Sequence, residues 1–192
     1  MEQGRGYLLI LIGVGLTVAG MLGVINQFIA GFGFIATMMG IQAVRASPRE
    51  LGYAYKFGII SLILNFAAFT IFQFRIFFLL WSIPLLALVM VFFDIGLYFW
   101  ILKAEYLWSP HNPKRRLDLQ IFTLVAGIYF VIHILLFLPG ALGINILPPG
   151  LWLQLANFIG LMTYIYYGLL IFIFTRFYLE EKNGTGGLKR WN

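Results

Sequence analysis

The sequence predicts an all-α membrane protein, a bundle of six transmembrane helices. Of its 192 residues, 61% are hydrophobic and only 10% are charged, whereas soluble domains hold roughly 45–50% apolar and about 25% charged residues. The apolar residues gather in runs near or above the ~17 residues that cross a ~30 Å hydrocarbon core. The segments between these runs are alternately rich and poor in basic residues, as in polytopic membrane proteins.

We place the spans at about residues 7–25, 28–44, 57–74, 76–102, 119–138 and 151–174. The charge-free run 7–44 would be roughly 57 Å long as one helix, which is too long for a single crossing. It therefore predicts a tight helical hairpin that turns at Asn26 and Gln27, and a second span so close to the first argues against a cleaved signal peptide. The fourth span contains Pro84, which is expected to bend it.

The charge pattern predicts the orientation. Of the 13 Lys and Arg residues, only Arg75 falls on one side of the six-span arrangement. The other twelve share the opposite side, which the positive-inside rule makes cytoplasmic: Arg5, Arg45, Arg49, Lys56, Lys103, Lys114, Arg115, Arg116, Arg176, Lys182, Lys189 and Arg190. We expect both termini in the cytoplasm, one bundle over residues 1–181, a cytoplasmic tail over 182–192, and the plasma membrane as the location.

Two connecting segments have distinct compositions. Segment 138–150 is an outer loop without charge, which we expect to lie in the interface, to dip back into the protein or to be covered by a partner. The inner loop 103–118 contains Lys114, Arg115 and Arg116. This cluster is typical of a topology signal, and the more specific interpretation is contact with anionic lipid or an acidic partner.

Small residues predict close helix packing, which replaces the hydrophobic effect as the driving force between helices in lipid. They form a stripe at four-residue spacing on the first span and lie roughly on one face of the second: Gly15, Ala19 and Gly23, then Gly33, Ala36 and Gly40. The simplest interpretation is that these spans pack on each other or on the third span. The alternative is that one stripe docks a partner subunit.

An inner polar layer is predicted around Asp94, the one charged residue well inside a predicted span. Asp94 and Asn65 both lie about 12 Å from the inner boundary, counted along their helices. Tyr98, Tyr166 and Tyr167 fall near this depth. Asp94 either ties the third, fourth and sixth spans together by hydrogen bonds, or serves as a proton or cation relay or a substrate contact, because ionisable residues are costly at such depth.

An outer polar layer is predicted to contain His133, Asn157, Gln154 and Tyr129, around 10 Å nearer the outer face than Asp94. This separation argues against a direct Asp94–His133 dyad, although water could link the two. His133 is expected to be a neutral imidazole bonded to Tyr129, Asn157 or a carbonyl. Haem ligation by two histidines is excluded by depth, because the other histidine, His111, lies in the inner loop.

The sequence contains no signature of an enzyme or of a cofactor. It has no cysteine, no hydrolase, metalloprotease or phosphate-loop motif, and no pair of carboxylates within the spans. The basic residues flank apolar spans, which favours a membrane surface over nucleic acid as their partner. We therefore expect a non-enzymatic protein without cofactor or metal.

Two functions remain. The first is a non-catalytic integral subunit of a larger membrane complex, supported by the scarce polar groups, the small-residue stripes and the apolar outer loop. Its expected partners are other membrane subunits, the bilayer and bound lipids. The second is a small-molecule or ion transport component with Asp94 as the proton or cation site.

In size and in six-span, inside–inside topology the chain resembles the substrate-binding components of energy-coupling-factor vitamin transporters. The resemblance covers topology and not sequence motifs. It implies that Gly15, Ala19 and Gly23 dock a transmembrane partner. It also implies an outer-half cavity lined by His133, Asn157 and Gln154, which would distinguish the transport function from the scaffold function.

Overall fold

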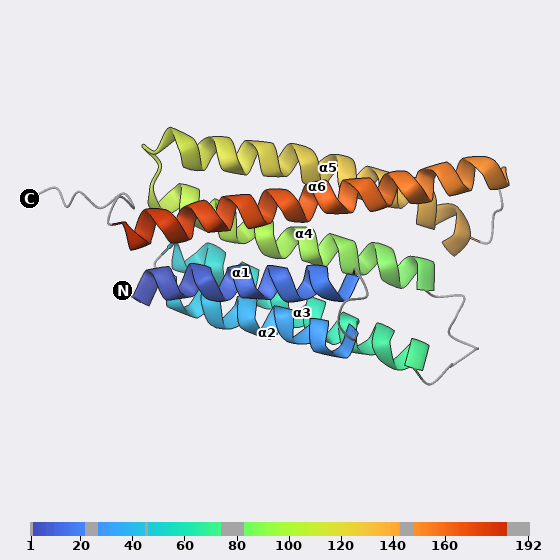
Figure 1. Ribbon diagram of the computed structural model, residues 1–192, viewed down its shortest axis with the longest axis horizontal. Helices are drawn as coiled ribbons and strands as arrows, with labels where there is room; N and C mark the ends of the chain where they lie inside the picture. Colours follow the sequence, from blue (N-terminus) through green and yellow to red (C-terminus); the bar gives the residue numbers. More distant parts are fainter. Residues whose placement is uncertain (1, 22–26, 45, 74–82, 143–147, 184–192) are drawn as a thin grey trace, which may run out of the picture.

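The computed structural model describes residues 2–21, 27–44, 46–73, 83–142 and 148–183. Within them the chain forms six helices that run alternately up and down the bundle (Figure 1). Their bounds are α1 (Glu2–Met21), α2 (Gln27–Ala43), α3 (Pro48–Gln73), α4 (Ile83–Trp108), α5 (Pro113–Ala141) and α6 (Pro149–Lys182). The predicted all-α fold is confirmed.

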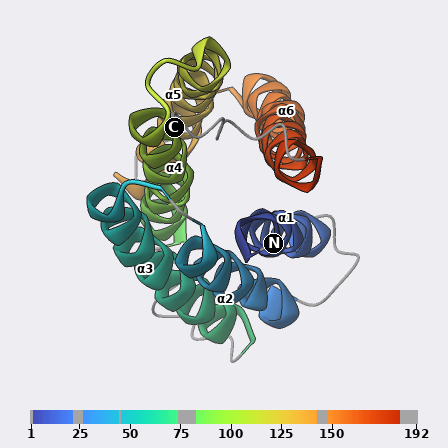
Figure 2. The ribbon, with the colours of Figure 1, turned by 90° about the vertical axis from the view of Figure 1, so that its left-hand side faces the viewer.

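The six helices form a ring. Each helix packs against the helices before and after it in sequence, and α6 returns to pack against α1. The view along the bundle shows this closed order (Figure 2). Four segments are long and apolar enough to cross a membrane, namely Pro48–Ile71, Pro84–Trp108, Pro113–Pro139 and Leu153–Lys182. The apolar stretches of α1 and α2, Gly4–Gly20 and Gly31–Ala43, are shorter.

All charged side chains that the structure describes, apart from Asp94, belong to helix turns near one end of the bundle, where α1 begins and α6 ends (Figure 1). We call this the basic end, because every described Lys and Arg lies there. Arg45, Lys189, Arg190 and Arg75, the one basic residue expected on the opposite side, lie outside the described residues.

Capping residues at the basic end make the helices longer than the predicted apolar spans. Helix α3 begins at Pro48 and not near residue 57: the Leu51 N–H donates to the Ser47 carbonyl at 3.0 Å, Pro48 suits the first helical position, and the Ser47 hydroxyl donates to the Glu50 carboxylate. Helix α5 begins at Pro113, where the Asn112 side-chain oxygen accepts the N–H of Lys114 at 3.0 Å. The predicted spans followed hydropathy alone and missed these caps.

The described residues do not test the bend that the sequence predicts at Pro84. That bend stays a prediction, because the described part of α4 begins at Ile83 and the residues just before it, 74–82, lie outside the described residues. Residues 76–82 of the predicted fourth span, Asn26 of the predicted hairpin turn and residues 143–147 of the apolar loop lie outside the described residues. The rest of that loop is partly helical, since α5 continues to Ala141 and α6 starts at Pro149.

Glycines at seven-residue spacing bring α1 and α2 into backbone contact. A Cβ atom built on Gly13 would lie 2.5 Å from the carbonyl oxygen of Gly33, and one on Gly33 would lie 2.6 Å from that of Gly13. Gly6 and Gly40 form an equivalent pair, with corresponding distances of 2.9 Å and 2.6 Å. The two helices therefore approach so closely that only glycine fits at these positions.

The packing face of α1 is thus not the predicted stripe. At 3.6 residues per turn, Gly15 and Ala19 point to the opposite side of α1 from Gly6 and Gly13, and a Cβ on Gly15 would meet nothing within 4 Å. Gly23 lies outside the described residues. On α2 the predicted Gly33 and Gly40 do face α1, and Ala36 is half-buried.

Alanine at positions 13 and 15 tests this assignment. We expect Gly13→Ala to lower the unfolding free energy by about 1–3 kcal/mol through overpacking against α2, and Gly15→Ala to leave it unchanged or slightly raised. Both substitutions gain the same helix propensity, so their difference isolates the contact. Thermal unfolding in mild detergent, followed by circular dichroism, measures it, and equal stabilities would contradict the assigned face.

Candidate functional site

A polar cavity of about 220 Å³ lies within the ring, and residues from all six helices line it. The lining residues are Thr17, Phe34, Ser61, Asn65, Ala87, Met90, Val91, Asp94, Tyr129, His133, Phe137 and Tyr167. An apolar cavity of about 150 Å³ accommodates benzene. This larger and more polar cavity has room for a small organic molecule or for an ion with several waters.

Asp94 supplies the only carboxylate among the lining residues. Its side chain is 7% exposed, and Oδ2 accepts a hydrogen bond of 3.0 Å from the hydroxyl of Tyr167 on α6. The other oxygen, Oδ1, is buried and has no hydrogen-bond partner among the residues that the structure describes. The carboxylate thus joins α4 to α6, and the Tyr166 hydroxyl lies close to it as well.

Further buried polar atoms surround Asp94. The hydroxyls of Tyr98 and Tyr166 are fully buried, and they lie close to Thr37 and Asp94 respectively without hydrogen-bond geometry. Within the described part of the chain, Ser61 Oγ and Asn65 Oδ1 also have no bonding partner. Buried polar groups are normally hydrogen-bonded, so this concentration of donors and acceptors suits a polar occupant.

His133 contributes a ring nitrogen to the same cavity. Its Nδ1 lies 2.8 Å from the backbone carbonyl oxygen of Tyr129, one helical turn earlier. A carbonyl oxygen only accepts, so Nδ1 carries the proton of this bond. Nε2 is consequently an acceptor in the neutral imidazole and a second donor in the charged one, which makes it the nitrogen that can exchange a proton or bind a solute.

Aromatic rings connect the two predicted polar layers. Tyr129 stacks on Tyr166 with ring centroids 4.8 Å apart, and Tyr166 meets Tyr167 edge-on at 4.9 Å. Tyr129 also contacts the His133 ring at 4.2 Å. The inner and outer layers are therefore one continuous site, because the tyrosine side chains bridge the depth that was counted along the helix backbones.

The structure thus brings together most of the predicted site residues. Asp94, Asn65, Tyr167, Tyr129 and His133 line the cavity, with Tyr98 and Tyr166 buried beside Asp94. The expected outer-half cavity is wrong, because only His133 of its three residues lines a cavity, whereas Asn157 and Gln154 are exposed on α6. The feature expected to distinguish transport from a scaffold is therefore missing from the described residues. The sequence analysis missed Thr17, although it is the one hydroxyl-bearing Ser or Thr in the apolar run 7–25.

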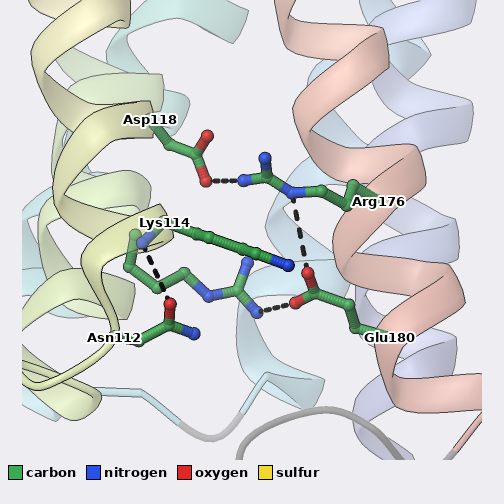
Figure 3. A network of polar contacts seen from close by, with 6 residues as sticks. Asn112, Lys114, Asp118, Arg176 and Glu180 are labelled. Carbon is green, nitrogen blue, oxygen red and sulfur yellow. Dashed lines mark hydrogen bonds and ion pairs between the residues drawn. The ribbon is translucent and has the colours of Figure 1, made fainter.

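A cluster of buried ion pairs closes the basic end between α5 and α6 (Figure 3). Arg115 pairs with Glu180 at 3.0 Å, and its guanidinium carbon lies 3.4 Å from the centre of the Phe177 ring. Arg176 contacts both Asp118 and Glu180, the latter at 3.7 Å. These ion pairs join α5 to α6 at the basic end.

This cluster separates the three basic residues that were predicted to contact anionic lipid. Lys114 and Arg116 are exposed, and only they remain available to a lipid headgroup. Arg115 is 6% exposed and is engaged with Glu180 and Phe177. The sequence shows Arg176 and Glu180 at i, i+4 spacing, which favours an ion pair. Hydropathy did not predict that this pair would be partly buried.

No group of three or more His, Asp or Glu side chains is placed to hold a metal ion in the described ranges. The cavity therefore offers a single carboxylate, one imidazole and several hydroxyl and amide groups. This set can bind a proton, a monovalent cation or a small polar solute.

Substitutions of the neighbouring residues Arg115 and Arg116 test whether the ion-pair cluster stabilises the fold. Arg115→Gln removes the charged hydrogen bond to Glu180 and the contact of the guanidinium with Phe177, so we expect a loss of unfolding free energy of about 1–3 kcal/mol. Arg116→Gln removes an exposed charge and should change stability by less than about 0.5 kcal/mol. Denaturation in mixed micelles compares them, and similar losses for both variants would contradict the structural role of Arg115.

Comparison of the chain with known proteins found no matching family model, no similar curated protein and no similar solved structure.

Proposed function

We propose that this protein is a transport component that binds a small solute or ion in the central cavity, with Asp94 as the proton or cation site. The observation that carries the proposal is the cavity itself, which all six helices line and in which Asp94 is the one carboxylate among the lining residues. Ionisable residues at membrane depth are costly and typically mark ion or substrate sites.

The chemistry of the cavity indicates the class of occupant. A carboxylate far from water requires a counter-charge, and the lining residues include no Lys or Arg. A proton, a monovalent cation or a small organic ammonium supplies that charge, while Ser61, Asn65 and His133 offer hydrogen bonds to the rest of a solute. The cavity holds no second carboxyl for acid–base chemistry, so the proposed role is binding and not catalysis.

For the membrane arrangement we propose six spans, with both termini cytoplasmic and the plasma membrane as the location. The support is the placement of every described Lys and Arg at the basic end, where α1 begins and α6 ends (Figure 1). Although α1 and α2 are shorter, their backbone contact through Gly13 and Gly33 makes the hairpin one unit that is inserted together.

A second candidate function is that of a non-catalytic subunit of a larger membrane complex. It is favoured by glycines that contact nothing within the chain: a Cβ on Gly15, Gly160 or Gly168 would meet no atom within 4 Å. Such positions leave room for the close approach of another helix. In this case Asp94 would be a structural residue and the cavity would have no solute of its own.

The substitution Asp94→Asn distinguishes between the two candidate functions. A ligand that binds only the folded protein stabilises it, by about 2.7 kcal/mol at about 100 times its Kd. We expect sodium, potassium or tetramethylammonium to raise the melting temperature of the wild type in nanodiscs, or protons to do so as the pH falls. Asp94→Asn should abolish the response to the three cations and reduce the response to protons, to which the buried carboxyl of Glu105 also contributes. His133→Gln should weaken the response.

Glu181→Gln is the matched control, because this carboxylate lies at the basic end outside the cavity, and it should respond as the wild type does. Identical responses of Asp94→Asn and wild type to all four titrations would refute the proposed site. The opposite result would be that Asp94→Asn keeps every response but no longer copurifies with proteins that accompany the wild type. That result would support the subunit function.

The absence of cysteine from the natural sequence makes the topology directly testable. We expect a membrane-impermeant maleimide added outside intact cells to label Asn26→Cys and Leu142→Cys. Lys114→Cys and Lys182→Cys should react only after the membrane is permeabilised. Labelling of Lys114→Cys and Lys182→Cys from opposite sides would disprove the common orientation of the basic end.

A further inference from the structure

A second cavity, an apolar groove of about 430 Å³, lies between α3, α4 and α5. Its lining residues are Phe57, Phe92, Ile95, Gly96, Phe99, Trp100, Phe122, Thr123, Ala126, Gly127 and Phe130. On α4 these residues lie on the side opposite to Asp94 and Val91, which line the central cavity. The groove is therefore separate from the proposed solute site.

The groove has the chemistry of a site for a hydrocarbon chain. The hydroxyl of Thr123 donates to the carbonyl of Leu119 at 2.7 Å within α5, so it needs no hydrogen-bond partner from an occupant of the groove. Phe92 contacts Phe57 and Phe130, with ring centroids 6.1 Å and 6.0 Å apart, and these rings close the end farthest from the basic end.

The length of the groove matches one leaflet. From Trp100 to Phe92 along α4, and from Phe122 to Phe130 along α5, it covers about 12 Å. Half of a ~30 Å hydrocarbon core is about 15 Å. A packed transmembrane helix would instead contact the bundle over both leaflets, so the groove is the size of an acyl chain and not of a partner helix.

Two lysine ammonium groups lie near the end of the groove that faces the basic end. The Lys103 ammonium lies 4.6 Å from the centre of the Trp100 ring, which lines the groove. Trp100 contacts Tyr53 in a tilted arrangement with ring centroids 4.8 Å apart, and the Lys56 ammonium lies 5.9 Å from the centre of the Tyr53 ring. Glu50 is near Lys103 as well, but its carboxylate accepts the Ser47 hydroxyl, and the two lysines leave a net positive charge beside the groove.

We propose that this groove binds one anionic phospholipid of the leaflet at the basic end. One acyl chain lies along α4 and α5 as far as Phe92 and Phe130. The phosphate lies against Lys103 and Lys56, where the ammonium groups and the interfacial rings of Trp100 and Tyr53 meet the headgroup region. This site is independent of the solute site, so either proposal can fail without the other.

Two sets of variants separate the chain from the headgroup. Gly127 lines the groove, and a Cβ there would meet nothing within 4 Å, so Gly127→Leu fills the groove without a clash at Cβ. Gly168→Leu is the matched control, since Gly168 is equally open but lines neither cavity. Lys56→Gln with Lys103→Gln removes the charges, and Lys114→Gln with Arg116→Gln removes two exposed charges elsewhere at the basic end.

The measurement is native mass spectrometry of the full chain from nanodiscs of equal parts phosphatidylglycerol and phosphatidylcholine. We expect the wild type and both controls to retain one phosphatidylglycerol. Gly127→Leu should lower the retained lipid of either kind about tenfold. The double Lys variant, whose changes are at the surface, should retain a lipid but lose the preference for phosphatidylglycerol.

Three results would overturn the proposal. One is equal retention of the two lipids by the wild type. Another is unchanged phosphatidylglycerol retention by folded Gly127→Leu, or by the double Lys variant if Gly127→Leu does not fold. The third is a dimer that Gly127→Leu dissociates while lipid retention is unchanged, which would assign the groove to contact between copies of the chain.

Discussion

In apolar surroundings a polar side chain must find its partner within the protein, and this constraint organises the whole ring. The helices satisfy it locally where they can: the hydroxyls of Thr17, Thr70, Thr123 and Thr163 each donate to a carbonyl four residues earlier, and His133 bonds in the same way. Asp94 cannot be satisfied by its own helix, and it faces the centre of the ring, where Tyr167 reaches it from α6. The other charged side chains among the described residues lie at the basic end. Within that part of the chain, charge is thus confined to Asp94 and one end of the bundle.

Two unlike contacts hold the ring around this site. The α1–α2 pair depends on missing side chains, since Gly13 and Gly33 let one backbone lie against the other. The α5–α6 pair depends on charged side chains, since Arg115 and Arg176 contact acidic partners at its basic end. Between these the aromatic residues Tyr98, Phe122 and Phe174 fill the interior. Phe122 contacts Tyr166 at 5.7 Å and Tyr98 contacts Phe174 at 6.1 Å.

The helical fold was predictable because hydropathy alone reveals long apolar runs, and Asp94 was predictable because a charge within such a run is conspicuous. The faces by which the helices pack against one another were not predictable. On α1 the stripe of Gly15 and Ala19 and the series Gly6, Gly13 and Gly20 lie on opposite sides, and nothing in a single sequence tells which side meets α2. Similarly, counting depth along backbones separated His133 from Asp94, because such a count ignores the reach of Tyr129 and Tyr166. The burial of Arg115 beside two exposed cations depends on Glu180, which is distant in sequence.

The cyclic order of the helices has a consequence for how the protein is made. Most contacts between helices join consecutive helices, so most of the ring can form from local contacts as each new helix follows its predecessor into the bilayer, without long-range search. The main exceptions involve α6, where Phe177 meets Tyr7 of α1 at 5.4 Å and Tyr167 bonds to Asp94 of α4. Until α6 arrives, the carboxylate of Asp94 lacks the hydroxyl of Tyr167 and the cavity lacks a wall. The proposed site is therefore completed in a single late step of biogenesis, when α6 packs against α1.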